Sequence, residues 1–219
     1  MRALVVSGQN GLRPEPMMTV SEHAAKYHYL PASASEPGRW RQSRVPYMKE
    51  VLDCLSSSHP CERVTFMKGA QITATEGGLC WINYTMHYAP GLMLLVMPGL
   101  SEVKRNTSTR INPMIEASPV LRELVSEPRS RDGGNSIFQK KFPGGELVMT
   151  GANSAKGLRS TPARYLFLDE IDGYPGDADG EGDPVDLAEQ RTVTFKARRK
   201  IYQVSTPTIE GQSRIAKAY

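Results

Sequence analysis

The amino-acid sequence predicts an α/β fold in which a mainly parallel sheet is flanked by helices. Two observations support this prediction. Helical patterns alternate with apolar segments along the chain, as in proteins whose helices connect parallel strands. The apolar segments are short and bounded by glycine, proline or polar residues, which is typical of strands buried on both faces; they lie at Leu92–Met97, Tyr165–Leu168 and Ile201–Val204.

The remaining elements follow from local patterns in chain order. Residues 1–37 alternate Pro/Gly/Ser clusters with one stretch, Val20–Tyr29, that could be helical, and we expect them to form an arm outside the core. Thr73 and Glu76 have capping-box spacing and place a helix start there. Further helices are expected at Pro46–Leu55, Thr75–His87, Ser101–Asn106, Pro113–Ala117, Pro119–Val125 and Pro184–Arg191, a strand at Arg63–Met67, and an edge hairpin at Ser136–Phe142 and Glu146–Thr150.

Composition excludes several protein classes. Of 219 residues, 39% are hydrophobic and 23% charged, which excludes collagen-like, disordered and membrane classes. No apolar run is long enough to span a bilayer and no signal-peptide pattern opens the chain, so we expect no membrane partner and a location in the cytoplasm. The three cysteines lack CxxC spacing and the four histidines lack metal-ligand spacing, so we expect all seven to be structural or incidental.

The charge is unevenly distributed. The formal net charge is only +4, yet residues 169–189 hold nine acidic residues and no lysine or arginine, so the rest of the chain is strongly basic. Such a distribution is compatible with a polyanionic partner and a local cation site, and equally with a solvated surface.

Two adjacent carboxylates, Asp169 and Glu170, follow the apolar segment Tyr165–Leu168. Ligands bind at the carboxyl ends of parallel strands, where one carboxylate can hold Mg²⁺ and the next can activate an attacking water. A simple turn would have the same sequence. If the pair is catalytic, a phosphate-binding loop should lie upstream between a strand and a helix, and residues 68–75 (KGAQITAT) occupy that place.

This segment departs from the standard P-loop pattern, because Ala74 stands where the lysine belongs. Lys68 at the other end of the loop is the only lysine that can supply charge, and Thr75 supplies a hydroxyl for Mg²⁺ at the helix start. A surface turn holding one lysine is the alternative interpretation.

Four segments together resemble the ATPase domain of the large terminase subunit of tailed bacteriophages, the lambda-like GpA family. They are residues 67–76 (MKGAQITATE), 168–175 (LDEIDGYP), 181–191 (EGDPVDLAEQR) and 204–208 (VSTPT), and residues 40–50 also resemble the family. The resemblance covers residues 38–219. It implies a RecA-like P-loop core of the ASCE class, a motor that uses ATP and Mg²⁺ to package double-stranded DNA. The implied partners are the terminase small subunit, the portal protein and further copies in a ring, with a monomer as the alternative for the isolated domain.

The resemblance also implies residue roles. In this family the P-loop lysine can stand at the start of the loop, as Lys68 does, although many members keep Gly-Lys at the positions of Thr73 and Ala74. Glu170 would be the catalytic base, Asp169 and Thr75 would surround Mg²⁺, and Arg159 would reach a neighbour's ATP. The remaining roles are coupling to the γ-phosphate for Ser205 and Thr206, contact with adenine for Gln42 and Arg44, and phosphate binding for Lys68, Gly69, Ala70, Gln71, Ile72, Thr73, Ala74 and Thr75.

Two rival functions stay possible on the sequence alone. The chain could be another ASCE ATPase, such as a helicase-like enzyme, or a catalytically silent prophage remnant that binds only DNA or partner subunits. Terminases of this family also carry a C-terminal metal-dependent nuclease domain, and we expect none within this chain, which ends at Tyr219.

Overall fold

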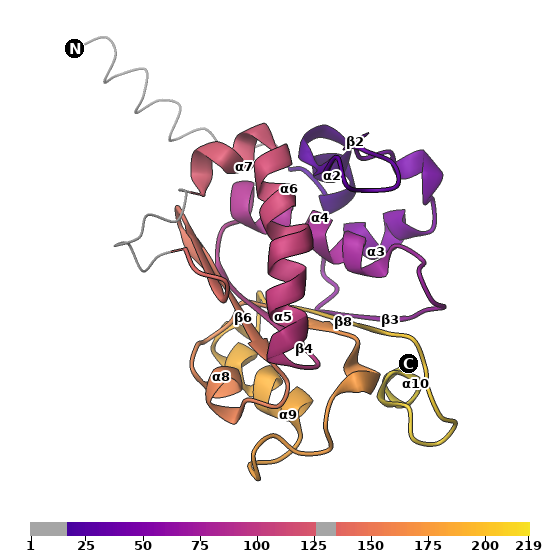
Figure 1. The fold of residues 1–219 in the computed structure, drawn as a ribbon, viewed down its shortest axis with the longest axis vertical. Coiled ribbons are helices and arrows are strands. Elements are labelled where there is room, and N and C mark those ends of the chain that lie inside the picture. The colour runs from indigo at the N-terminus through magenta and orange to yellow at the C-terminus, as the bar shows by residue number, and fades with distance from the viewer. Residues whose placement is uncertain (1–16, 126–134) are drawn as a thin grey trace, which may run out of the picture.

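A computed structural model describes residues 17–125 and 135–219 and contains a six-stranded sheet (Figure 1). Five strands are parallel, and the edge strand β5 is antiparallel to β6. Across the sheet, the order is β3 (Arg63–Met67), β8 (Lys200–Ser205), β7 (Tyr165–Asp169), β4 (Leu92–Met97), β6 (Gly145–Gly151) and β5 (Gln139–Phe142). The predicted fold class and every predicted strand are therefore confirmed.

Alternation along the central strands builds two cores, one on each face of the sheet. In β4, Met93 and Leu95 belong to one core cluster, whereas Leu94 and Val96 belong to the other. Because successive side chains of a strand point to opposite faces, an uninterrupted apolar segment serves both cores at once.

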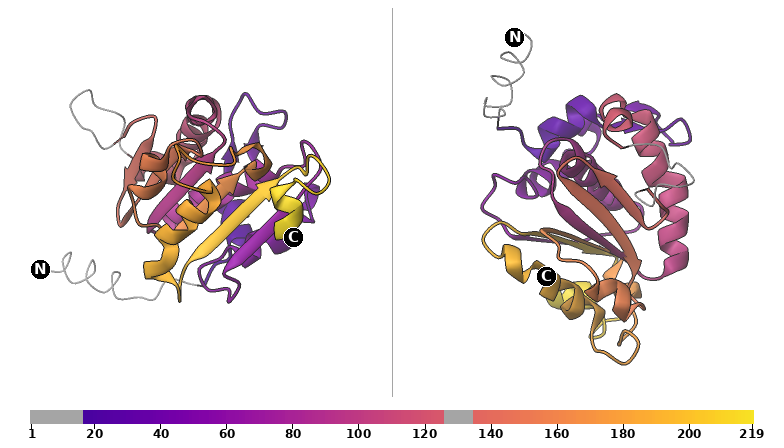
Figure 2. Two further views of the ribbon diagram at one scale, coloured as in Figure 1. Left: turned by 90° about the horizontal axis from the view of Figure 1, so that it is seen from below. Right: turned by 90° about the vertical axis from the view of Figure 1, so that its left-hand side faces the viewer.

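Helices cover both faces (Figures 1 and 2). One core is closed by α2 (Val20–Tyr27), α3 (Met48–Cys54), α4 (Ala74–His87), α5 (Leu100–Asn106), α6 (Asn112–Ala117) and α7 (Pro119–Leu124). The other is closed by α8 (Ala155–Arg159), α9 (Pro184–Glu189) and α10 (Arg214–Ala218). The short elements are β1 (Tyr29–Leu30), β2 (Gly38–Arg39), η1 (Gln42–Arg44), η2 (Thr107–Ile111), η3 (Ile171–Gly173) and η4 (Gln190–Phe195).

Helix α4 lies close against the centre of the sheet. Trp81 packs edge-on against the rings of Tyr165 and Tyr202, with ring centroids 5.8 and 6.3 Å apart. A Cβ at Gly78 would lie only 2.1 Å from the ring of Phe167, so glycine is required for this approach. The position of α4 matters for function because the candidate phosphate loop leads into it.

The expectation that the N-terminal stretch stays outside the core is wrong for helix α2. Thr19 and Glu22 form a complete capping box at its start, and Val20 and Ala24 are fully buried in the core that contains α4. An apolar face on a short capped helix is enough to hold it on the domain. Residues 1–16 lie outside the described residues, and the boundary at residue 37 stays a prediction.

Local patterns missed three features. The helices α8 and α10 were not predicted, and α5 continues through the π-helix η2 into α6 as one rod (Figure 1). Pro113 lacks the N–H that an α-helix would use at this point, which is consistent with a locally widened turn. Within the described ranges, no helix is both long and apolar enough to cross a membrane.

Candidate active site

The candidate phosphate loop leaves β3 at Lys68 and enters α4 at Ala74. Gln71 and Thr73 adopt positive φ angles of 57° and 65°, in the left-handed region that disfavours β-branched side chains. Thr73 therefore caps the helix without a side-chain hydrogen bond, and the predicted capping box with Glu76 is wrong. Glu76 instead binds the imidazole of His28, at 2.9 Å. Strain of this kind is retained at binding sites, where the surrounding structure holds it in place.

The acidic pair lies at the same edge of the sheet as this loop. Nζ of Lys68 donates hydrogen bonds to Oε1 of Glu170 at 2.6 Å and to Oγ1 of Thr206 at 2.9 Å. Oγ1 of Thr75 lies 3.4 Å from Oδ1 of Asp169. Residues separated by about a hundred positions thus meet, because β3 and β7 both end here.

Strand β8 runs between β3 and β7, so the residues that follow it separate the loop from the acidic pair. The Ser205 hydroxyl and the Thr206 backbone N–H both face Oε2 of Glu170, at 3.4 Å. Glu170 itself has a positive φ of 56°, which turns it off the strand axis. The predicted coupling residues therefore contact both the lysine and the predicted base.

Burial controls the charge of Asp169. Its side chain is 4% exposed, and burial together with the neighbouring Glu170 raises the pKa of Asp169 to about 7. Lys68, Arg110 and the Thr75 hydroxyl oppose this shift without cancelling it. A buried oxygen ligand that is incompletely compensated fits a divalent cation, and the Thr75 hydroxyl beside it would complete a Mg²⁺-binding pair.

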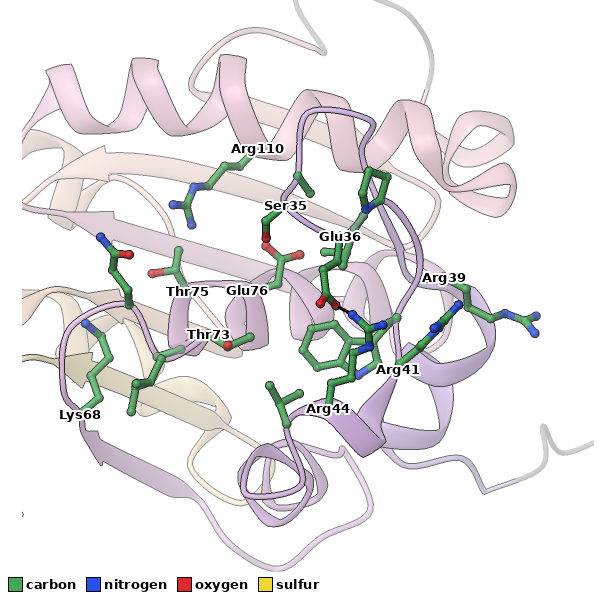
Figure 3. A pocket seen from close by; sticks show the side chains of 18 of the residues that line it. Ser35, Glu36, Arg39, Arg41, Arg44, Lys68, Thr73, Thr75, Glu76 and Arg110 are labelled. Carbon is green, nitrogen blue, oxygen red and sulfur yellow. Dashed lines mark ion pairs between the residues drawn. The ribbon is translucent and has the colours of Figure 1, made fainter.

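A pocket of about 1070 Å³ opens between the loop and residues 30–45 (Figure 3). Its lining includes five basic residues against three acidic ones, Glu36, Glu76 and Glu170; the basic residues are Arg39, Arg41, Arg44, Lys68 and Arg110. All the loop residues from Gln71 to Thr75 also line it. The pocket therefore favours an anionic ligand of drug-like or nucleotide size.

Arg110 is a pocket residue that sequence reasoning missed. It reaches from η2 toward the end of the loop that holds Thr75 (Figure 3), and it has no hydrogen bond or ion pair within the described part of the chain. Only the widened π-turn gives it this direction. No sequence signal distinguishes it from other exposed arginines, although π-helical turns are frequent at functional sites.

Three other predicted residues stand apart from the loop. Gln42 uses its amide inside its own segment, accepting from the Trp40 ring nitrogen and donating to the Val45 carbonyl, and it does not line the pocket. Arg44 lines the pocket and forms an ion pair with Glu36. Arg159 lies on α8, forms an ion pair with Glu181 and does not line this pocket, which suits a residue assigned to a neighbour's site.

Comparison with known proteins identifies the family. A family model described as the ATPase domain of the phage terminase large subunit gpA matches residues 34–219. No curated protein matches the chain significantly.

Solved structures show the same fold at low sequence identity. The ATPase domain of the large terminase of Thermus phage P74-26 has a TM-score of 0.50 and 15% identity, covering 67% of this chain and 60% of that one. A variant of that domain gives 0.50 and 14%, covering 68% and 61%. A large terminase of a thermophilic bacteriophage in complex with ADP gives 0.46 and 15%, covering 73% and 38%. The chain thus spans less than two thirds of each structure's length. Because the family model covers most of the sequence, the chain belongs to the phage terminase large subunit gpA ATPase-domain family.

Proposed function

We propose that this chain binds ATP in the pocket beside the phosphate loop and hydrolyses it to drive DNA packaging. The observation that carries the proposal is the convergence of Lys68, Glu170 and Thr206 at one point, with Thr75 and Asp169 beside it. A lysine, a carboxylate and a hydroxyl brought together at the ends of three neighbouring strands supply charge neutralisation, water activation and a sensor for the terminal phosphate.

The ion pair between Lys68 and Glu170 gives the site a ligand-dependent base. While Nζ of Lys68 holds Oε1 of Glu170, that carboxylate oxygen is not free to accept a proton from water. A phosphate bound in the loop competes for the lysine and releases Glu170 to act as general base. Arg110, aimed at the same end of the pocket, would share the neutralisation of phosphate charge. Mg²⁺ held by Asp169 and Thr75 would supply further charge stabilisation.

The partners in this proposal are double-stranded DNA, the portal protein, the small terminase subunit and further copies of this chain, in the cytoplasm of the bacterial host. Arg159 must leave Glu181 to reach a neighbour's nucleotide. We therefore expect the isolated chain to be a slow ATPase whose rate rises with its own concentration or with duplex DNA. Arg159→Ala should remove that rise while leaving the basal rate.

The test is a titration with a fluorescent ATP analogue, followed by measurement of phosphate release with and without duplex DNA. Glu170→Gln should bind the analogue as the parent does and lose hydrolysis by about 10²-fold or more, because only water activation is removed. Asp186→Asn, an exposed acid on α9, is the matched control and should change neither quantity.

Other outcomes favour the rival functions. Failure of the parent chain to bind the analogue would favour a silent remnant that only binds DNA or partner subunits. DNA-stimulated hydrolysis accompanied by separation of the strands of a labelled duplex would favour a helicase-like ATPase. Parent-level hydrolysis by Glu170→Gln would remove Glu170 from the mechanism.

A further inference from the structure

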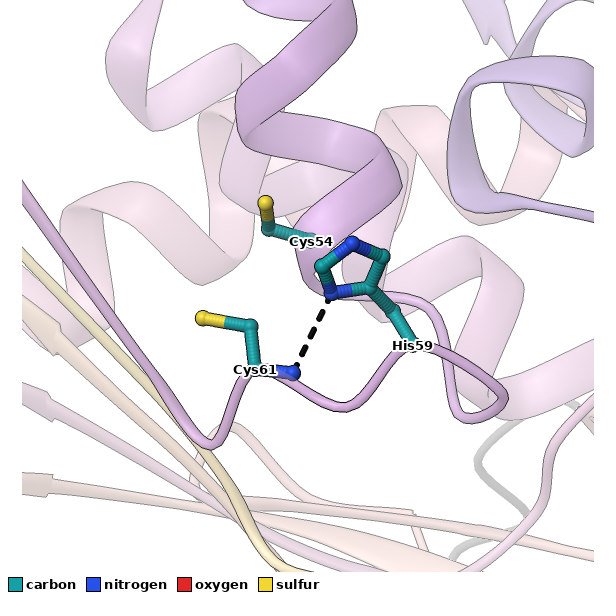
Figure 4. A group of neighbouring side chains, drawn as sticks. All are labelled: Cys54, His59 and Cys61. Carbon is teal, nitrogen blue, oxygen red and sulfur yellow. Dashed lines mark hydrogen bonds between the residues drawn. The ribbon is translucent and has the colours of Figure 1, made fainter.

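Two cysteines and a histidine converge at the opposite edge of the sheet, away from the pocket. Cys54 is the last residue of α3, Cys61 lies just before β3, and His59 lies in the loop between them. One potential ligand atom from each side chain lies within 4.8 Å of the others (Figure 4). The sequence prediction that these residues are incidental rested on spacing, and the turn after α3 brings together residues that match no standard motif. We call this group the Cys54–His59–Cys61 cluster.

One buried lysine fixes the backbone of all three residues. Lys200 opens β8 and is 3% exposed, and its Nζ donates to the carbonyl oxygens of Cys54, His59 and Cys61, the first at 3.3 Å. The Cys61 backbone N–H also donates to Nδ1 of His59 at 3.2 Å, which holds the imidazole beside that cysteine. The positions of the three side chains are therefore set before any ligand arrives, which lowers the entropic cost of binding one.

The donor set specifies the class of ligand. Two thiolates and an imidazole suit Zn²⁺, which takes four tetrahedral ligands, whereas Mg²⁺ and Ca²⁺ prefer oxygen. Glu50 lies one turn before Cys54 on α3 and lines the same surface hollow as Cys54 and His59. A carboxylate oxygen from Glu50, or a water, would complete the coordination.

We propose that the Cys54–His59–Cys61 cluster binds one Zn²⁺ ion with a structural role. The ion would tie the end of α3 to the start of β3, the strand whose other end delivers Lys68 and the phosphate loop. Because the site lies at the opposite edge of the sheet, the proposal is independent of ATP hydrolysis.

The test uses the purified, untagged chain after removal of metals and full reduction. Titration with Co²⁺, a spectroscopic stand-in for Zn²⁺, should give thiolate-to-cobalt charge-transfer absorption that saturates at one equivalent. Excess Zn²⁺ should abolish this absorption. Cys54→Ser and Cys61→Ser should each weaken binding at least tenfold, and His59→Gln should weaken it too. Cys80→Ser is the matched control, because Cys80 is fully buried in α4 and should leave binding unchanged.

Stability supplies a second readout. Zn²⁺ should raise the thermal midpoint of the parent chain and of Cys80→Ser, but not that of Cys61→Ser. A cobalt spectrum without charge-transfer bands, or one unchanged in both cysteine variants, would overturn the proposal. So would a Cys54–Cys61 disulfide that re-forms after reduction in the presence of equimolar Zn²⁺, measured by thiol titration, because the pair would then prefer oxidation to metal.

Discussion

Two buried lysines lie at opposite ends of the neighbouring strands β3 and β8, and they differ in what holds them. Lys68 follows β3, is 8% exposed and binds a carboxylate and a hydroxyl, Glu170 and Thr206. Lys200 opens β8, is 3% exposed and binds three backbone carbonyls of the segment between α3 and β3. Both satisfy the requirement that a buried ammonium group be hydrogen-bonded.

The difference in partners separates a lysine that can change partners from one that cannot. The side chain of Glu170 is 41% exposed and can rotate into water, so a phosphate can take its place on Lys68. The carbonyls around Lys200 belong to a fixed turn and have no comparable freedom. Burial lowers the pKa of Lys200, yet its three acceptors give it a structural role. We therefore expect Lys68 to act in function and Lys200 in stability.

The largest expected effect is on nucleotide binding, from Lys68→Ala. Loss of a desolvated charge-assisted contact costs on the order of 2–5 kcal/mol, which is roughly 30-fold or more in affinity. Titration with a fluorescent ATP analogue measures it, and urea unfolding should show a much smaller change in stability, since Glu170 can turn to solvent. An affinity equal to the parent's would contradict the role assigned to Lys68 and leave Arg110 as the main phosphate contact.

Lys200→Met should produce the reverse pattern. Methionine keeps the apolar stem but leaves three carbonyls without their donor, at a cost of about 2–4 kcal/mol in the free energy of unfolding. Urea unfolding at neutral pH measures this cost. Nucleotide affinity in the folded protein should stay within about threefold of the parent. A stable variant that fails to bind nucleotide would reverse the assignment of the two lysines.

A third buried basic group, His23 on α2, sharpens the comparison because its hydrogen-bond partner is another imidazole, Nδ1 of His87, at 3.0 Å. Burial, followed by the charges of His87, His28 and Lys26, lowers the pKa of His23 from 6.5 to about 3. The unfolded chain therefore binds a proton that the native state refuses between these values. Stability should be complete above pH 6.5 and fall below it by up to about 1.4 kcal/mol per pH unit.

Urea unfolding at a series of pH values from 8 to 5 measures this slope. His23→Gln cannot titrate, so its curve should be flatter than the parent's by the contribution of His23. Identical slopes for the two proteins would mean that His23 is already protonated in the native state.

The smallest expected effect comes from the strained loop. Thr73→Gly removes a Cβ from a residue at φ 65°, and relief of this strain outweighs the added freedom of the unfolded chain, for a gain of about 0.5–1 kcal/mol. Ala70→Gly, in the same loop and outside the left-handed region, is the control and should lose a similar amount. Thermal unfolding of the two variants measures both. Destabilisation by Thr73→Gly equal to that of Ala70→Gly would show that the loop carries no strain at Thr73.

The strands and the acidic pair could be predicted because their signals are local. Leu92–Met97 and Tyr165–Asp169 are apolar over their whole length, and Glu170 follows directly in the sequence. Parallel strands end at one edge, so the meeting of the loop with this pair also followed from sequence order. Helix α2 was judged wrongly because its single apolar face has meaning only against α4, to which the sequence gives no distance.

The amino-acid sequence by itself determined the fold class, the strands and the loop that could hold phosphate, since period and composition are properties of consecutive residues. Only the tertiary structure decided which side chains meet. The insertion of β8 between β3 and β7 brings Thr206 to Lys68, a π-turn aims Arg110 into the pocket, and Lys200 gathers Cys54, His59 and Cys61. These contacts depend on strand order, helix register and burial, which short-range patterns do not encode.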